Sequence, residues 1–303
     1  MATYGLDVPA FAAHQPQDFY RRVVAIAERH GFHNLWVGDH LLWHQPRFET
    51  FALLGLLSGL TRLTIGTGIV LAPLRPAWWT AKSAATLART SPGGFILGLG
   101  AGGEFAPEFA LAQVDPAQRG TLVEQTVSLC REAWGGGIEG FSPVSSSPVP
   151  IWLAGHKERA LRRIARIADG WLGLFLDPTE FRAAADGLKL HCAEQGRPMV
   201  SLGMTLWVCI DDDECGARQS ALARIADEYQ LPEKAFARHV IAGPAEHVAS
   251  VVQRYIDAGA EHICFHIAHP DPLTQAERIG VEVLPLLGMP AVGEMPSISE
   301  FRR

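Results

Sequence analysis

The sequence predicts an α/β fold, a (β/α)8 TIM barrel with insertions after the fourth and the seventh strand. Eight short apolar runs, rich in β-branched and aromatic residues, alternate with longer stretches in which apolar residues recur every three or four positions. The runs are almost continuously apolar, as is typical of parallel strands buried on both faces, and this favours a closed barrel over an open doubly wound sheet. The stretches 100–150 and 211–243 are longer than a plain strand-helix unit requires, so we expect the insertions there.

Each of the eight runs is bounded by turn-forming residues, and together they define the predicted strands. We expect these at Thr3–Val8, His33–Val37, Leu63–Val70, Phe95–Leu99, Ile151–Ala154, Trp171–Leu176, Leu202–Ile210 and His262–Ile267. Between them lie helical stretches such as 19–27 and 248–256, whose apolar residues would face the barrel.

Several predicted helices begin with the same pattern, an N-cap candidate followed by proline. It occurs at Asp115-Pro116, Asp177-Pro178 and Gly243-Pro244, each with a Glu or Gln further on that could reach back to the cap. A last helix would begin at Asp271-Pro272 and end near Gly288, where glycine suits the C′ position. We therefore expect one barrel domain over residues 1–288 and an irregular tail over 289–303.

Composition excludes several classes of protein. The 303 residues are 48% hydrophobic and 19% charged, enough to bury a large core, and the net charge of −6 argues against nucleic acid as a partner. No apolar run reaches the ~18 residues of a spanning helix and the first residues do not resemble a signal peptide, so we expect no membrane partner and a cytoplasmic location. Five scattered cysteines without C-x-x-C spacing favour reduced thiols over a disulfide framework or a zinc site.

The ends of the predicted strands carry the candidate functional residues, because barrel active sites lie at the carboxyl ends of the strands. Glycines follow the second, third, fourth and fifth strands, within 36–40, 65–70, 98–104 and 153–156. Glycine lets the backbone approach a flat or anionic ligand closely, which indicates a cofactor site. Gly98-x-Gly100-x-x-Gly103 matches the dinucleotide fingerprint, but it follows the fourth strand and does not lead directly into a helix, so a true Rossmann site is disfavoured and a simple tight turn is an alternative.

Two side chains in this region could take part in proton transfer. His40 could give a proton to a substrate or hydrogen-bond to a cofactor, and Glu104 could be an acid or a surface carboxylate. Asp39 would orient the loop. The stretch after Gly155-His156 predicts a helix start suited to phosphate, and the four arginines at positions 159, 162, 163 and 166 form either part of that site or a solvated face.

Other catalytic classes find little support in the sequence. His262 and His266 share one face of the last strand but His269 does not, and no H-x-H follows the first strand, so we expect no metal. Neither G-x-S-x-G nor G-x-x-x-x-G-K occurs, which argues against common hydrolases and P-loop NTPases.

The ordered motifs strongly resemble the bacterial luciferase-like flavin-dependent oxidoreductase (monooxygenase) family, and more closely its members that use the deazaflavin coenzyme F420. The motifs are Gly31–His40, Thr61–Gly68, Gly93–Gly102, Pro150–Gly155, Ala168–Trp171 and Gly243–Glu246, within residues 1–270. The sequence departs from the family at 88–92, where an Asp and a Ser-Gly-Gly-Arg run are usual, which changes a turn more than the ring site.

The resemblance implies a barrel that holds coenzyme F420, or alternatively FMN, against the strand ends. A non-prolyl cis peptide is implied at Gly68-Ile69, with His40 and Glu104 near the reacting carbon. The residues implied to hold the cofactor are Asp39, Thr67, Gly68, Ile69, Gly100, Ala101, Gly102, Ala154, Gly155 and His156. Trp43, Trp78 and Trp79, expected in loops, could wall a substrate pocket, cover the barrel mouth or form a dimer contact.

Three functions follow from this resemblance. The first is hydride transfer between F420 and a small organic substrate. The alternatives are an FMNH2-dependent monooxygenase that uses O2 and a flavin-binding protein without catalytic activity, because fold does not determine function. The resemblance also implies a homodimer.

Overall fold

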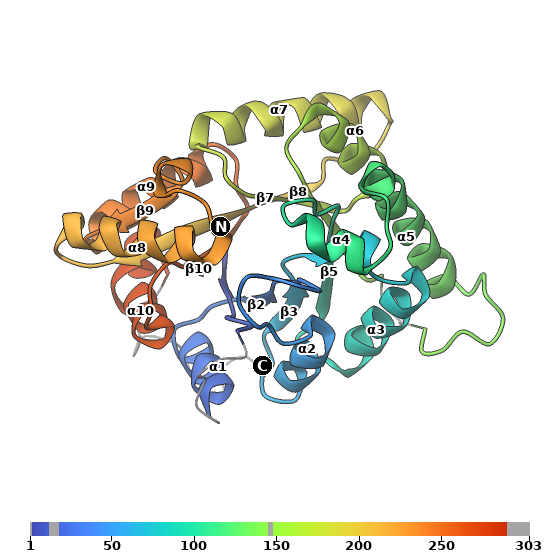
Figure 1. Ribbon diagram of the computed structural model, residues 1–303, viewed down its shortest axis with the longest axis horizontal. Coiled ribbons are helices and arrows are strands. Elements are labelled where there is room, and N and C mark those ends of the chain that lie inside the picture. Colours follow the sequence, from blue (N-terminus) through green and yellow to red (C-terminus); the bar gives the residue numbers. More distant parts are fainter. Residues whose placement is uncertain (1, 12–17, 145–147, 290–303) are drawn as a thin grey trace, which may run out of the picture.

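The computed structural model describes residues 2–11, 18–144 and 148–289. It confirms the predicted barrel, in which eight parallel strands form a closed ring (Figure 1). These are β1 (Thr3–Asp7), β2 (Asn34–Val37), β3 (Thr64–Thr67), β5 (Phe95–Gly100), β6 (Ile151–Ala154), β7 (Gly170–Gly173), β8 (Ser201–Ile210) and β10 (His262–Ile267). Pairing of β10 with both β1 and β8 closes the ring.

Helices surround this ring (Figure 1), and most of them contribute buried apolar residues to the core around the strands. They are α1 (Phe19–Arg29), α2 (Thr50–Ser58), α3 (Ala77–Thr90), α4 (Ala106–Leu111), α5 (Arg119–Trp134), α6 (Glu158–Ile167), α7 (Pro178–Glu194), α8 (Glu214–Tyr229), α9 (Ala245–Asp257) and α10 (Pro272–Arg278). Short 3-10 turns lie at η1 (Ala72–Leu74), η2 (Pro116–Gln118), η3 (Glu233–Ala235) and η5 (Pro285–Leu287), and η4 (Ile279–Val283) is a π-helical turn after α10. No helix among the described residues is both long and apolar enough to cross a membrane.

Two connections contain more than one helix. Between β5 and β6 the chain forms α4, η2 and α5, and between β8 and α9 it forms α8, η3 and the short strand β9 (Val240–Gly243). β9 pairs with the carboxyl half of β8, which extends past the ring far enough to provide an edge. The sequence analysis did not predict β9 and assigned its residues to the insertion after the seventh strand. β4 (Val70–Leu71) continues the third predicted strand after a break at residues 68–69.

Three of the four predicted caps on helix starts are present. Asp177 forms a full capping box with Glu180, and Asp115 and Asp271 each accept a backbone N–H two or three residues on. The prediction for Gly243-Pro244 was wrong, because α9 begins at Ala245 without a side-chain cap. Gly288 ends the last turn with φ +84°, as predicted, whereas the predicted tail lies outside the described residues apart from Met289.

The interior of the barrel is filled by aromatic side chains from strands on opposite sides of the ring. The rings of Trp36, Trp152 and His262 lie 5.4–5.6 Å apart between centroids. Trp36 Nε1 donates a hydrogen bond to His262 Nε2 at 3.0 Å, and burial lowers the pKa of His262 to about 3, so this ring is a neutral acceptor. A Cβ on Gly170 would stand 2.4 Å from the Trp152 ring, so glycine there makes room for the indole. His262 is therefore part of the core, separate from His266 at the strand end.

Candidate active site

The barrel mouth, the rim formed by the carboxyl ends of the strands, is made of backbone along β2, β3 and β5. The peptide bond Gly68-Ile69 is cis, as the resemblance implied. Thr67 Oγ1 donates to the carbonyl of Gly98 at 2.6 Å and accepts from its N–H at 2.8 Å, which fixes the end of β3 to β5. The side chain of Thr67 is buried, so any contact of this residue with a cofactor would be made by its backbone.

The glycines of β5 are required for the close packing of this rim. A Cβ on Gly98 would lie 2.0 Å from the Thr67 carbonyl oxygen, and one on Gly100 would lie 1.9 Å from Ile69 Cδ1. Gly38 faces the same rim, since a Cβ there would lie 3.7 Å from the Gly68 carbonyl oxygen. We call this backbone-lined part, with Ala101, Gly102 and Ala154 beside it, the glycine half of the mouth.

The turn after β6 has the features of an anion site. Gly155 adopts φ +117°, and its carbonyl accepts a hydrogen bond from the buried Trp171 Nε1 at 2.8 Å. Lys157 at the N-cap of α6 provides no side-chain hydrogen bond, so the first-turn N–H groups of this ten-residue helix lack a side-chain cap. His156 is exposed beside this turn, and burial and the neighbouring Lys157 lower its pKa. Uncapped backbone N–H groups and the neighbouring Lys157 therefore lie where the sequence predicted a phosphate.

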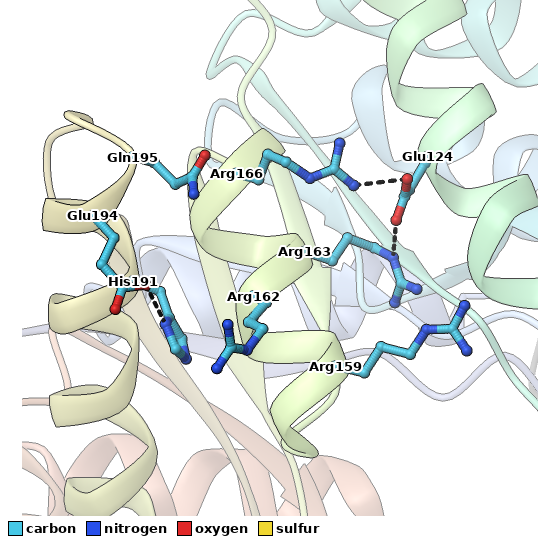
Figure 2. A pocket seen from close by; sticks show the side chains of 8 residues that line it. All are labelled: Glu124, Arg159, Arg162, Arg163, Arg166, His191, Glu194 and Gln195. Atoms are coloured by element: carbon cyan, nitrogen blue, oxygen red, sulfur yellow. Dashed lines mark hydrogen bonds and ion pairs between the residues drawn. The ribbon is translucent and has the colours of Figure 1, made fainter.

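The arginines of α6 lie on the outer side of this helix, in a cavity of about 280 Å³ that Figure 2 shows together with Glu124 of α5 and residues of α7. Arg163 and Arg166 both contact Glu124, at 3.0 and 2.7 Å, and Arg162 contacts Glu158 at 2.5 Å. Within the described part of the chain Arg159 makes no ion pair. Three of the four arginines are thus paired with carboxylates, which favours a solvated, charged face over a phosphate site for these three.

A histidine and a buried glutamate form the most reactive pair at the mouth. His40 Nδ1 lies 3.3 Å from Oε2 and 3.4 Å from Oε1 of Glu108, whose side chain is 0% exposed. The N–H of Leu41 donates to the same carboxylate at 3.2 Å. Because Glu108 occupies Nδ1, the other ring nitrogen of His40 remains available to a ligand.

Sequence reasoning chose the other glutamate of this segment. Glu104 is exposed and makes no hydrogen bond or ion pair with any described residue, whereas Glu108 lies one helical turn further on, in α4. The signal that was missed is a carboxylate followed directly by the buried Phe109 in a short, otherwise apolar helix.

Asp39 holds the loop that carries His40. Its carboxylate accepts hydrogen bonds from Arg75 Nη2 at 2.5 Å and Nε at 3.0 Å, from Thr50 Oγ1 at 2.9 Å, and from the N–H of Leu71 at 3.1 Å. With four donors on two buried oxygens, this carboxylate is satisfied by the protein itself. Asp39 therefore orients the loop, as expected, and its place in the predicted cofactor-binding set stays a prediction.

The opposite part of the mouth is built from large side chains, and we call it the aromatic half. Trp43 stacks on His40 at 3.7 Å between centroids and meets Tyr229 at 5.4 Å. Trp207 of β8 lies 5.9 Å from Tyr229 and 3.6 Å from His266. These contacts join the loop after β2 to α8 and to the ends of β8 and β10.

A buried charge cluster supports the aromatic half. His266 Nδ1 lies 2.6 Å from Asp7 Oδ2 and Nε2 lies 3.9 Å from Glu228 Oε2, while Arg47 contacts Glu228 at 2.6 Å. Burial lowers the pKa of His266, but Asp7 and Glu228 outweigh it and raise the pKa to about 9. Burial likewise opposes ionisation of Glu228, yet His266, Arg47 and Arg224 hold its pKa at about 2. His266 and Glu228 are therefore both ionised at neutral pH.

The three tryptophans predicted for a substrate pocket occupy two different places. Trp43 lies at the mouth, whereas Trp78 and Trp79 lie in the first turn of α3, with 53% and 69% of their surface exposed. They were expected in loops, and the structure corrects this, because α3 begins at Ala77 directly after the 3-10 turn η1.

Fold and site together define a parallel barrel whose mouth suits a flat, phosphorylated cofactor. The sequence matches the family described as "Luciferase-like monooxygenase" over residues 8–262, and the chain belongs to this family. It is therefore a luciferase-like oxidoreductase.

Individual relatives give finer comparisons. The chain is 29% identical to an F420-dependent glucose-6-phosphate dehydrogenase of Nakamurella multipartita, over 86% of this chain and 90% of that protein. It is 26% identical to an F420-dependent hydroxymycolic acid dehydrogenase of Mycobacterium tuberculosis, over 86% and 82%. Among solved structures, an F420-dependent secondary alcohol dehydrogenase shares the fold with a TM-score of 0.82 at 18% identity, over 94% of this chain and 99% of that chain.

Proposed function

We propose that this protein transfers a hydride between coenzyme F420 and a small organic alcohol or carbonyl compound. The observation that carries the proposal is the His40–Glu108 pair, 3.3 Å apart, beside the cis peptide of the glycine half. The relatives described as F420-dependent dehydrogenases, 26–29% identical over most of the chain, support the choice of cofactor.

The residues present fit such a cofactor. At Gly98 and Gly100 the strand β5 presents no side chain of its own, and Ile69 packs closely against it, so a flat ring system could lie on this part of the rim. The uncapped start of α6, with Gly155 and His156, would hold a phosphate group. When bound, the deazaflavin supplies a carbon that accepts or releases a hydride and reacts poorly with oxygen.

The protein's own contribution is control of the accompanying proton. In the oxidative direction the free nitrogen of His40 would accept the proton of the substrate hydroxyl, while a bound cofactor would take the hydride from the alcohol carbon, so the alcohol would become a carbonyl compound. Glu108, buried against Nδ1, positions the imidazole and stabilises its cationic form. The stacked Trp43 excludes water from the pair.

The exposed apolar side chains on α2 and α3 favour the expected homodimer. Leu56, Trp78 and Trp79 are 49–69% exposed on these two packed helices, a pattern typical of interfaces. Four of the five free cysteines are buried and none is paired, which is compatible with a reducing compartment such as the cytoplasm.

Turnover under nitrogen tests the proposed activity. The purified protein with oxidised F420 should reduce the cofactor when a secondary alcohol is added, without consuming oxygen. Oxygen uptake with reduced FMN would instead support a monooxygenase, and tight cofactor binding without either reaction would support a binding protein.

A further inference from the structure

Building on the proposed function, we infer the substrate class: a ring-bearing secondary alcohol or ketone that carries an additional hydrogen-bond-accepting oxygen, without a phosphate group. The inference concerns the aromatic half of the mouth. It rests on three features of that half: buried N–H groups that make no hydrogen bond, aromatic side chains around them, and cations that are already engaged in ion pairs.

Several buried donors at the mouth have no partner. Within the described chain, Trp43 Nε1, Trp207 Nε1 and Arg47 Nε make no hydrogen bond, although their atoms are buried. The acceptor Glu228 Oε2 beside them also makes no hydrogen bond, but it faces the cations of Arg224 at 3.6 Å and His266 at 3.9 Å. Buried N–H groups in native proteins are almost always paired with protein, water or ligand. Three such donors in one region of the mouth therefore indicate a bound molecule that presents acceptor oxygens.

These donors lie close to the proposed reaction site. Trp43 stacks on His40, and a Cβ on Gly38 would stand 3.6 Å from Arg47 Nη1 and 3.7 Å from the Gly68 carbonyl of the cis peptide. Arg47 thus extends from the glycine half to Glu228 in the aromatic half. A substrate whose reacting oxygen is at His40 can reach the donors with a second oxygen.

The surfaces around the donors are aromatic. Tyr229 is the centre of this group, with Trp43, Trp207, Phe175 and Phe236 at 5.3–5.9 Å between ring centroids. Such surfaces favour a flat or alicyclic apolar body over a polyhydroxylated sugar, because sugar hydroxyls would lose water without gaining partners.

Ion pairing in the aromatic half argues against a phosphorylated substrate. Arg47 lies 2.6 Å and Arg224 3.6 Å from Glu228, and His266 lies 2.6 Å from Asp7, so three cations share two carboxylates. A phosphate dianion needs cations that are free to form charge-assisted hydrogen bonds. Relatives are described as glucose-6-phosphate dehydrogenases, whereas these three cations of the aromatic half are each engaged in an ion pair.

A matched pair of ligands tests the inference by calorimetry without cofactor. The probes are 4-methoxyacetophenone and 4-ethylacetophenone, which have nearly the same shape but differ in one acceptor oxygen. The native protein should bind the methoxy compound at least about fivefold more tightly, because one additional hydrogen bond is worth about that factor. Glucose 6-phosphate should give no binding at millimolar concentration.

Variants then locate the donor. Trp207→Phe and Trp43→Phe keep an aromatic ring but remove the N–H, so at least one of them should abolish the preference for the methoxy compound. Trp134→Phe is the matched control, because Trp134 Nε1 donates to the Ala81 carbonyl away from the mouth, and it should retain the preference.

The remaining outcomes are decisive. Equal binding of the two ketones, binding of neither, or binding of glucose 6-phosphate in their place would overturn the substrate class. A parallel titration with F420 distinguishes failure of the inferred substrate class from failure of the proposed cofactor. F420 binding without a ligand preference would refute only the substrate class, and a ligand preference without F420 binding would refute only the cofactor.

Discussion

The two halves of the barrel mouth are built in opposite ways. The glycine half is lined mainly by backbone, where Gly98 and Gly100 leave room for the Thr67 carbonyl and the Ile69 side chain to pack against β5. The aromatic half consists of side chains: the rings of Trp207 and His266 lie 3.6 Å apart between centroids, and Arg47 contacts Glu228 at 2.6 Å. A rim made of backbone suits a common cofactor, whereas a wall made of side chains can vary with the substrate. The comparison suggests that cofactor and substrate specificity occupy separate parts of the same rim.

His40 lies where the two halves meet, and its removal should have the largest effect. We expect His40→Ala to lower kcat by about 10²–10⁴-fold, the usual contribution of a positioned acid or base. Binding of F420, measured by fluorescence, should change little because the glycine half is intact. Retained turnover would contradict the catalytic role of His40.

Glu108 should have a smaller effect than His40, because it contacts Nδ1 of the imidazole and would act on the reaction only through His40. Glu108→Gln should lower kcat by about 10–100-fold, less than loss of the imidazole, since the ring stays in place but its cation loses a buried carboxylate. The pH profile of kcat should shift as well, which a purely structural role would not produce. Glu104→Gln is the matched comparison. A larger loss of kcat in Glu104→Gln than in Glu108→Gln would favour Glu104, which the sequence predicted, as the carboxylate that supports catalysis.

The glycine half should be intolerant of a single methyl group. Gly98→Ala would place Cβ 2.0 Å from the carbonyl oxygen of Thr67, a backbone atom that cannot easily move aside, so we expect about 1–3 kcal/mol of destabilisation and weaker F420 binding. Gly55→Ala in α2 is the matched control, because nothing lies within 4 Å of its Cβ position and alanine should stabilise that helix by up to ~1 kcal/mol. Thermal unfolding of both variants gives the comparison, and equal stability would show that the rim is not tightly packed.

The contribution of the aromatic half to folding stability should depend on pH. The pKa of His266 is raised from 6.5 to about 9, so its pairing with Asp7 stabilises the folded state fully below about pH 6.5 and less as pH rises through 9. Asp7→Asn should therefore lower the Tm most at or below pH 6.5, and the difference from the native protein should shrink above pH 9. A Tm difference independent of pH would contradict an ionised His266.

The strands that could be predicted from the sequence are those that local residue patterns define. Ile151–Ala154 and His262–Ile267 were placed without error, since short apolar runs between turn signals define buried strands. The cis bond at Gly68-Ile69 followed from family motifs alone. Partners brought together by the fold were not predictable: Glu108 reaches His40 across 68 positions and Glu228 reaches Arg47 across 181. No pattern along the chain records such contacts between distant residues, and the role predicted for Glu104 stays a prediction.

Titration of the purified apoprotein with F420 and, separately, with FMN tests the central claim most directly, because the claim assigns the glycine half to a deazaflavin. The account predicts fluorescence changes that indicate micromolar or tighter binding of F420 and much weaker binding of FMN. Preference for FMN would shift the chemistry to oxygen, and binding of neither would contradict the assignment of this rim to a flavin cofactor.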